Sequence, residues 1–256
     1  MTSNTIIRTR DMAIGYDDNT VASGINLRVA KGGITVVLGQ SGCGKSTLLK
    51  TLIGLLPPIS GQLDFYGRTV DFLSEESLRE LYGRIGVLYQ NGALLNSLSL
   101  FENVALPITM HYPGIGRGIV REMVANRLRQ VGLSGDLERY PSELSGGMRK
   151  RAALARAMIL DPEVILCDEP SAGLDPITAS GLDELMLDLK ELLGVTFVVV
   201  THELRSIERI ADDVVVIHEG VIRFNGPYPQ LEKTTDPFVN AFFLKNGSAK
   251  REENQP

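Results

Sequence analysis

The sequence predicts an α/β fold with a mostly parallel sheet, a small N-terminal antiparallel β subdomain and an inserted helical subdomain. Three observations support this prediction. Short β-branched runs alternate with segments of helical spacing in the first and last thirds of the chain, which is typical of parallel sheets. Residues 91–160 carry few strand signals, which indicates the helical insertion. A glycine-rich segment lies between an apolar strand and a helix, at residues 39–46.

In the first third of the chain, the apolar pattern predicts five strands and two helices. The strands are expected at residues 6–16, 21–29, 34–38, 61–66 and 84–89. One helix is expected over residues 47–56, ended by Pro57 and Pro58. A second is expected over 74–82, with Ser74 as its N-cap and acidic residues in its first turn.

In the last third, strands and helices alternate again. Helices are expected at residues 176–193 and 204–211, and strands at 164–167, 195–200, 214–217 and 221–224. A short amphipathic helix is expected at 237–244, followed by a polar, disordered tail at 246–256. We therefore expect a nucleotide-binding domain over residues 6–226, with the helical subdomain at about 91–160, and a C-terminal extension over 227–256.

Length, charge and cysteine content exclude several classes of protein. The 256 residues can bury a full core, and the net charge of −5 argues against a general nucleic-acid surface but not against local nucleotide binding. Two cysteines, in apolar or glycine-rich surroundings, indicate a reducing compartment. We find neither an apolar run of about 20 residues nor a signal peptide at the N-terminus. A cytosolic protein is expected, one that reaches a membrane only through a partner.

The glycine-rich segment fits the phosphate-loop pattern G-x-x-x-x-G-K-[ST] without a gap. Backbone N–H groups of such a loop surround phosphate oxygens, the lysine reaches the β- and γ-phosphates, and the hydroxyl binds Mg²⁺. The following helix adds its N-terminal dipole. We predict a P-loop NTPase core that binds ATP and Mg²⁺ through Gly39, Gln40, Ser41, Gly42, Cys43, Gly44, Lys45, Ser46 and Thr47.

Two carboxylates end the apolar run at residues 164–167. Neighbouring strand residues face opposite ways, so Asp168 and Glu169 cannot do the same job. Asp168 is expected to bind Mg²⁺ beside Ser46, and Glu169 to act as general base toward water. The alternative is an ordinary acidic turn.

A second anion-binding motif is predicted at Leu144-Ser145-Gly146-Gly147-Met148, ahead of a helix rich in Arg149, Lys150, Arg151 and alanines. Two glycines expose the backbone and Ser145 supplies a hydroxyl at a helix N-terminus. A helix cap alone is the alternative.

In their order along the chain, these motifs resemble the nucleotide-binding subunits of ATP-binding cassette (ABC) transporters, over roughly residues 6–226. The resemblance implies that Tyr16 stacks on adenine, that Gln90 touches Mg²⁺ or water, that His202 reaches the γ-phosphate, and that Asp175 helps to link two active sites. The alternatives are a core tyrosine, a polar strand cap and a structural histidine. Glutamine is common in the family where Met148 stands, so this position is expected to pack rather than contact ribose.

The resemblance also implies partners. A second copy would close its Ser145–Gly147 segment over ATP held in the phosphate loop of the first. Residues 88–95, 101–107 and 144–152 resemble ATPases of the Mla type, which move phospholipid between Gram-negative membranes with an integral permease, an MCE-domain lipid-binding protein and a small STAS-domain regulator. This implies a peripheral position at the cytoplasmic face of the inner membrane. A non-transport cytosolic scaffold, and an importer of another substrate, remain the alternatives.

Overall fold

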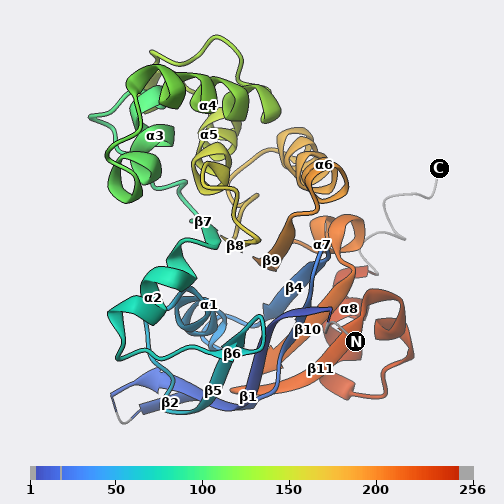
Figure 1. Cartoon of the computed structure of the whole chain (residues 1–256). Helices are drawn as coiled ribbons and strands as arrows, with labels where there is room; N and C mark the ends of the chain where they lie inside the picture. Colours follow the sequence, from blue (N-terminus) through green and yellow to red (C-terminus); the bar gives the residue numbers. More distant parts are fainter. Residues whose placement is uncertain (1–3, 18, 248–256) are drawn as a thin grey trace, which may run out of the picture. The chain divides into compact units, whose positions relative to one another are not determined.

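The computed structural model of the chain describes residues 4–17 and 19–247. The fold is α/β, with one antiparallel and one mostly parallel sheet arrangement, as the sequence predicts. The chain divides into two compact units: residues 1–70 with 200–256 form the first, and residues 71–199 form the second. Figure 1 labels most of the helices and strands of both units.

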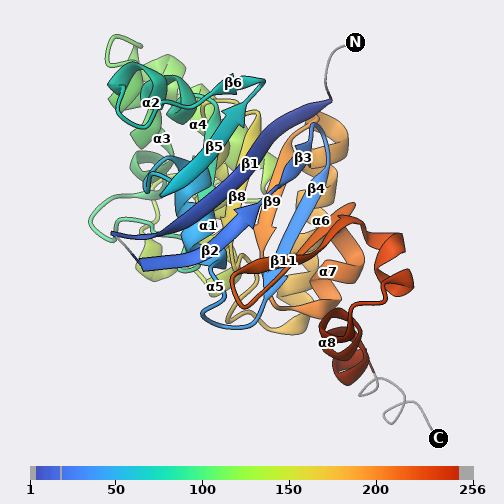
Figure 2. The same ribbon diagram turned by 90° about the horizontal axis from the view of Figure 1, so that it is seen from below.

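The antiparallel sheet of the first unit is organised around one long strand, β1 (Thr5–Tyr16). Its strand order is β2-β1-β5-β6, and a short strand also pairs with β1, as Figure 2 shows from below. In β1, Ile7 lies opposite Phe65 and Thr9 opposite Leu63. The other strands are β2 (Asn19–Ile25), β3 (Arg28–Ala30), β5 (Ser60–Phe65) and β6 (Arg68–Thr69).

The sequence predicted one strand over residues 21–29, and this is wrong, because β2 and β3 are separate. The chain breaks at Asn26, whose amide Nδ2 donates to Asp11 Oδ1 at 2.9 Å and whose Oδ1 accepts from Asp11 N at 3.0 Å. Asp11 itself has a φ of 43°, and the register of the β1–β5 pairing shifts around it, between Arg10 and Ala13. A long-range side-chain pair therefore divides a segment that reads as continuous.

The parallel strands of the first unit are β4 (Ile34–Gly39) and β10 (Asp213–His218). All of β4 is buried, and Gly39 at its end lies opposite Ile217. Helix α1 (Lys45–Ile53) follows, while α7 (Leu204–Ile210) precedes β10 and β11 (Val221–Pro227) pairs antiparallel with β10. The expected end of the first helix at Pro57 is wrong: Gly54, with a φ of 88°, caps α1 earlier.

In the second unit, β7 (Ile85–Leu88) and β8 (Val164–Asp168) pair in parallel, and β9 (Thr196–Val200) lies next to β8. The pairing sets Leu88 opposite Cys167, so the segments that follow both strands leave the sheet at the same edge. Helices α2 (Glu75–Tyr82) and α6 (Pro176–Leu193) belong to this unit, and both have the predicted bounds within one residue.

Helices α3 (Leu100–His111), α4 (Arg117–Gln130) and α5 (Gly146–Met158) pack against one another in the second unit (Figure 1). A 3₁₀ turn, η1 (Pro141–Glu143), leads into α5. Val104, Val124, Leu128 and Leu154 from the three helices are fully buried, so this group has an apolar core of its own.

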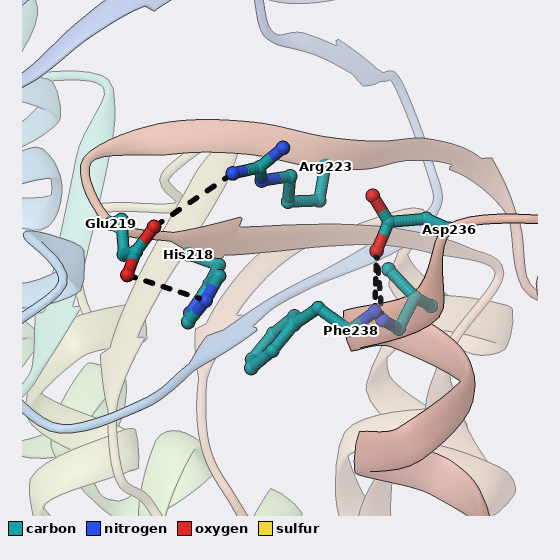
Figure 3. Close-up of polar contacts among 6 residues, drawn as sticks. His218, Glu219, Arg223, Asp236 and Phe238 are labelled. Atoms are coloured by element: carbon teal, nitrogen blue, oxygen red, sulfur yellow. Dashed lines mark hydrogen bonds and ion pairs between the residues drawn. The ribbon is translucent and has the colours of Figure 1, made fainter.

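The C-terminal segment contains the 3₁₀ turn η2 (Tyr228–Lys233) and helix α8 (Pro237–Gly247). Asp236 caps α8 by accepting from Phe238 N at 2.9 Å and Val239 N at 3.0 Å. Figure 3 shows the ring of Phe238 lying against His218 at the end of β10. The tail was predicted from residue 246, but α8 continues through Gly247; the rest of the predicted tail lies outside the described residues. Within the described part of the chain, no helix combines the length and apolar character that crossing a bilayer requires.

Candidate nucleotide site

The phosphate loop connects β4 to α1 in the first unit. Gly42 and Gly44 have φ values of 81° and 105°, a region that other L-residues rarely adopt, and Gly44 is the N-cap of α1. The Cys43 N–H donates to Gln40 O at 3.3 Å and closes a turn inside the loop. The loop therefore ends at a helix N-terminus, which is the local geometry that binds phosphate.

Lys45 extends back over this loop. Its ammonium donates to Gly39 O at 2.8 Å and to Gln40 O at 2.9 Å, and lies 3.9 Å from Cys43 Sγ. Ser46 and Thr47 follow in the first turn of α1, Ser46 exposed and Thr47 buried. The charged group is thus held at the mouth of the loop rather than in bulk solvent.

Gly39 is required here because of a close approach. A Cβ at this position would lie 2.1 Å from Ile217 O and 2.7 Å from Cys43 Sγ. Neither atom can move away easily, since Ile217 belongs to β10 and Cys43 to the loop itself. Packing by the neighbouring strand therefore excludes every side chain at the start of the loop.

Tyr16, at the end of β1, is 45% exposed, which excludes a core role for its ring. Lys50 Nζ donates to Tyr16 Oη at 3.0 Å and lies 5.5 Å from the ring centroid. The hydrogen bond from Lys50, followed by one from Thr47, lowers the pKa of Tyr16. These contacts hold the ring beside α1, the helix that follows the phosphate loop.

His202 lies between β9 and α7, with an exposed side chain. The preceding residue, Thr201, donates its N–H to Val37 O at 3.3 Å, so this segment runs beside β4. The first unit therefore brings together three of the predicted elements: Tyr16, the phosphate loop and the segment that carries His202.

The second unit holds the carboxylate pair. Asp168 is the last residue of β8 and Glu169 follows it, both half-buried. Glu169 has a φ of 46°, a left-handed conformation that costs a non-glycine residue about 1–2 kcal/mol. Its carbonyl accepts from Ala172 N at 3.2 Å. Gln90 lies two residues beyond β7, exposed, at the same sheet edge as the carboxylates.

Ser145, Gly146 and Gly147 start helix α5. The Ser145 side chain accepts from Met148 N at 3.2 Å, so the serine is a true N-cap. A Cβ on Gly147 would lie 2.4 Å from Thr178 Cγ2, so this glycine is needed for packing against α6. Ser145 therefore caps α5, which was the alternative interpretation of this motif. The same residues also form the exposed N-terminus of α5 that anion binding requires.

Asp175 caps α6. Its carboxylate accepts from Ile177 N at 3.1 Å, Thr178 N at 3.0 Å and Thr178 Oγ1 at 2.5 Å. The bonds from Thr178, side chain first, lower the pKa of Asp175. Asp175 and the Ser145–Gly147 segment therefore both adjoin Thr178, within one unit.

Comparison with known proteins decides the family. A protein-family model described as "ABC transporter" matches residues 22–172. The chain belongs to the ABC transporter family. Among relatives, the intermembrane phospholipid transport ATP-binding protein MlaF of Haemophilus influenzae is 40% identical over 95% of this chain and 91% of its own length. MlaF of Escherichia coli is 37% identical over 93% of this chain and 88% of its own length. A probable ribonucleotide transport ATP-binding protein, mkl of Mycobacterium leprae, is 36% identical over 92% and 68%.

Solved structures of ABC ATPases have the same fold. CbiO1 of Clostridium perfringens, part of the transporter complex cbiONQ, has a TM-score of 0.84 at 27% identity and covers 97% of this chain and 100% of its own. A dimeric structure of the cassette MJ0796, bound to ADP and Pi, has a TM-score of 0.78 at 27% identity and covers 87% and 98%. As a member of this family, the chain is an ABC ATPase that binds and hydrolyses ATP.

Two residues of this ABC ATPase were missed by sequence reasoning. Lys150 stands between two arginines in a basic run, yet it is only 5% exposed. Asn103 is fully buried and holds the loop before α3, accepting from Leu95 N and donating to the carbonyls of Leu95, Leu98 and Ser99. Only the burial of Lys150 has a signal in the sequence, since it lies on the same face of α5 as the fully buried Ala153 and Leu154; its hydrogen-bond partners have none.

Proposed function

We propose that this ABC ATPase is the motor subunit of a transporter that moves phospholipid between the inner and outer membranes of a Gram-negative envelope. The observation that carries this proposal is the 40% identity to MlaF of Haemophilus influenzae, which extends over nearly the whole of both chains. The aligned region covers the ATPase core, which ABC transporters of different substrates share, and also the segments outside that core.

ATP is proposed to bind to the phosphate loop in the first unit. Tyr16 would stack on adenine, backbone N–H groups of residues 39–44 would surround the phosphates, and Lys45 would exchange its two carbonyl partners for β- and γ-phosphate oxygens. The geometry of the loop supports this role, because the loop ends at the N-terminus of α1 and the Lys45 ammonium is held at its start, by Gly39 O and Gln40 O.

Mg²⁺ is proposed to be held by Ser46, Gln90 and Asp168, the last directly or through water. These side chains offer hydroxyl, amide and carboxylate oxygens, the donors that this hard cation prefers. Among the described residues no three His, Cys, Asp or Glu side chains cluster as a metal site. A small protein donor set fits Mg²⁺, which takes its remaining ligands from phosphate and water. When bound, the ion would neutralise charge on the phosphates.

Hydrolysis is proposed to use Glu169 as the general base. Glu169 would accept a proton as the water oxygen attacks the γ-phosphorus, and the bond from that phosphorus to the β–γ bridging oxygen would break, giving ADP and phosphate. His202 would donate a hydrogen bond to the γ-phosphate, and Gln90 would orient the water. The left-handed backbone at Glu169 supports a functional position, since such strain is concentrated at active sites.

A second copy is proposed to complete the site. Ser145, Gly146 and Gly147 at the start of α5 would contact ATP bound to the partner's phosphate loop, and Asp175 would link the two sites. The dimeric MJ0796 cassette supports this arrangement. ATP would then favour the closed dimer and hydrolysis would release it, a two-state switch driven by a ligand.

The membrane partners are proposed by analogy with the Mla system. They are an integral permease dimer, an MCE-domain lipid-binding protein and a small STAS-domain regulator, which would hold this chain at the cytoplasmic face of the inner membrane. A second candidate is ribonucleotide transport, because mkl of Mycobacterium leprae is 36% identical over 92% of this chain. A cytosolic scaffold without a permease is the remaining alternative.

The catalytic assignment is tested with Glu169→Gln and Lys45→Ala. We expect Glu169→Gln to bind ATP, to hydrolyse it at least about 100-fold more slowly than wild type, and to accumulate as an ATP-bound dimer in size-exclusion chromatography. Lys45→Ala should lose ATP binding and remain a monomer. Wild-type hydrolysis by Glu169→Gln would show that the base is another residue.

The transport assignment is tested by purifying the chain from membranes with its coexpressed partners. Phospholipid-stimulated ATPase activity in the purified complex is the expected result. Stimulation by ribonucleotides instead would favour the second candidate, and a soluble complex without a permease would favour the scaffold.

A further inference from the structure

A buried lysine connects the two motifs proposed to act on water and the γ-phosphate. The ammonium of Lys150, on helix α5, donates to Gln90 O and, at 3.2 Å, to Glu169 O. Its side chain is 5% exposed, so these bonds form away from bulk water, where they are strong and where losing them leaves unpaired groups. All three residues belong to the second unit.

The surroundings of Lys150 compensate for its burial only in part. Burial lowers the pKa of Lys150, while Cys167, Glu169 and Asp168 act to raise it. The ammonium therefore lies within electrostatic reach of both carboxylates of the β8 motif. A lysine placed for solubility or surface charge would not be found in such a position.

The segment that follows Gln90 is held by the same helix. Arg156, about two turns beyond Lys150, donates to Gly92 O at 2.8 Å and Ala93 O at 2.7 Å. Gly92 and Ala93 both have positive φ, of 71° and 49°, so this turn is tight and depends on such bonds. Helix α5 therefore fixes the backbone of residues 90–93 at three carbonyls.

Glu169 needs the same kind of support. Its φ of 46° is sparsely populated for a side chain of this size, and its carbonyl is oriented by Lys150 and by Ala172 N. Removing the ammonium leaves one of these two bonds. The peptide after Glu169 would then be free to rotate, and the direction of the carboxylate would change with it.

We propose that Lys150 is a positioning residue for ATP hydrolysis, which sets the backbone geometry of Gln90 and Glu169 together and couples both to the start of α5. This inference rests on the proposed roles of Gln90 and Glu169. Lys150 itself touches neither nucleotide nor water in this scheme. Its loss should slow the chemical step and leave ATP binding by the phosphate loop intact, because that loop belongs to the first unit.

Arg151 provides a matched control on the same helix. It also donates to two backbone carbonyls, Val131 O at 3.1 Å and Gly181 O at 3.0 Å, but neither belongs to a proposed catalytic motif. Lys150→Met and Arg151→Met therefore each remove one cation and two side-chain-to-backbone bonds from α5. A purely structural role predicts the same outcome for both variants.

The experiment measures kcat and KM for MgATP, the Kd for a fluorescent ATP analogue and the thermal midpoint of the full chain in complex with its partners. For Lys150→Met we expect kcat to fall about tenfold or more, with KM and Kd within about twofold of wild type. Arg151→Met should keep kcat within about threefold while its thermal midpoint falls. Lys150→Arg, which keeps the charge and the donors, should restore most of kcat.

An equal kcat in the two methionine variants, at matched thermal midpoints, would overturn the inference, as would a loss confined to KM or Kd. If Lys150→Met does not fold, Lys150→Gln and Lys150→Arg carry the same comparison, and wild-type kcat in Lys150→Gln overturns it. Glu169→Gln distinguishes a failure of the proposed catalytic base from a failure of the inference about Lys150. If Glu169→Gln hydrolyses ATP normally, the proposed base is wrong. If Glu169→Gln is inactive and Lys150→Met is fully active, only the positioning role of Lys150 is refuted.

Discussion

The imidazole ring of His218 lies flat on the phenyl ring of Phe238, with 3.6 Å between ring centroids and 9° between ring planes. His218 ends β10, and the residue before it, Ile217, lies opposite Gly39 in the pairing with β4. Helix α8 is thus attached, through one ring, to the strand that flanks the phosphate loop. His218 also lies 3.9 Å from Glu219, which in turn is 3.9 Å from Arg223.

Replacing Phe238 with Ala should release α8 from β10. The ring is partly exposed, so we expect a loss of about 1–2 kcal/mol, most of it from the stacked pair and the apolar area. Hydrogen exchange of residues 237–247 should rise, and Phe238→Leu should retain part of the protection. Unchanged exchange in Phe238→Ala would show that Val239, which is fully buried, suffices to hold the helix.

Asn103→Ala should destabilise the loop that precedes α3. The variant removes the side chain that bonds the Leu95 N–H and the Leu98 carbonyl, whereas the Leu95 and Ser99 carbonyls keep backbone bonds from Leu98 N and Asn103 N. We expect a loss of about 2–3 kcal/mol in urea unfolding. Asn126→Ala is the control, because that side chain is exposed and bonds only Arg129. A loss no greater than that of the control would contradict the role of Asn103.

The cap at Asp175 should make stability depend on pH at the acidic end. Its folded pKa lies below the ordinary aspartate value, so its contribution is present above that ordinary value and is lost as the pH falls through the folded pKa. Asp175→Asn keeps a capping side chain and removes the titration. The difference in thermal midpoint between wild type and this variant should therefore shrink as the pH is lowered below the ordinary aspartate pKa of about 3.9. A constant difference would contradict this account.

The two cysteines should differ in reactivity. Cys167 is fully buried, and burial raises its pKa, so it should remain unmodified in the folded protein. Cys43 is 7% exposed, and the residues before it in the loop, Ser41 and Gly42, are exposed. Its thiol should therefore react slowly with an alkylating reagent. An alkyl group there would displace Lys45 and block phosphate binding, so ATP should protect the thiol. Full ATPase activity after complete modification of Cys43, located by mass spectrometry, would refute the prediction.

Elements with local signals could be predicted closely from the sequence. Helix α6 begins at Pro176 after an Asp cap and ends before Gly194, as the pattern indicates. Ser74 caps α2 through its bond to Ser77 N. The phosphate loop was recognisable because its chemistry depends on a contiguous run of residues.

Features that depend on distant partners were not predictable. The break between β2 and β3 comes from the pair Asn26–Asp11, fifteen residues apart. Lys150 reads as one more charge in a basic run, and only the fold places its ammonium between Gln90 and Glu169, which lie 60 residues before it and 19 after it. Side-chain bonds to remote carbonyls leave no periodic trace in a sequence.

The contact between Gly39 and Ile217 O has a consequence for mutational scans of the loop. A side chain at residue 39 collides with β10 whether or not nucleotide is present, whereas a Cβ at Gly42 would meet no atom within 4 Å. Inactive variants at residue 39 would therefore report a failure to fold, and variants at residue 42 a failure of loop conformation. Substitutions at the two glycines of this motif therefore test different properties: those at Gly39 test packing against β10, and only those at Gly42 test the loop conformation that ATP binding requires.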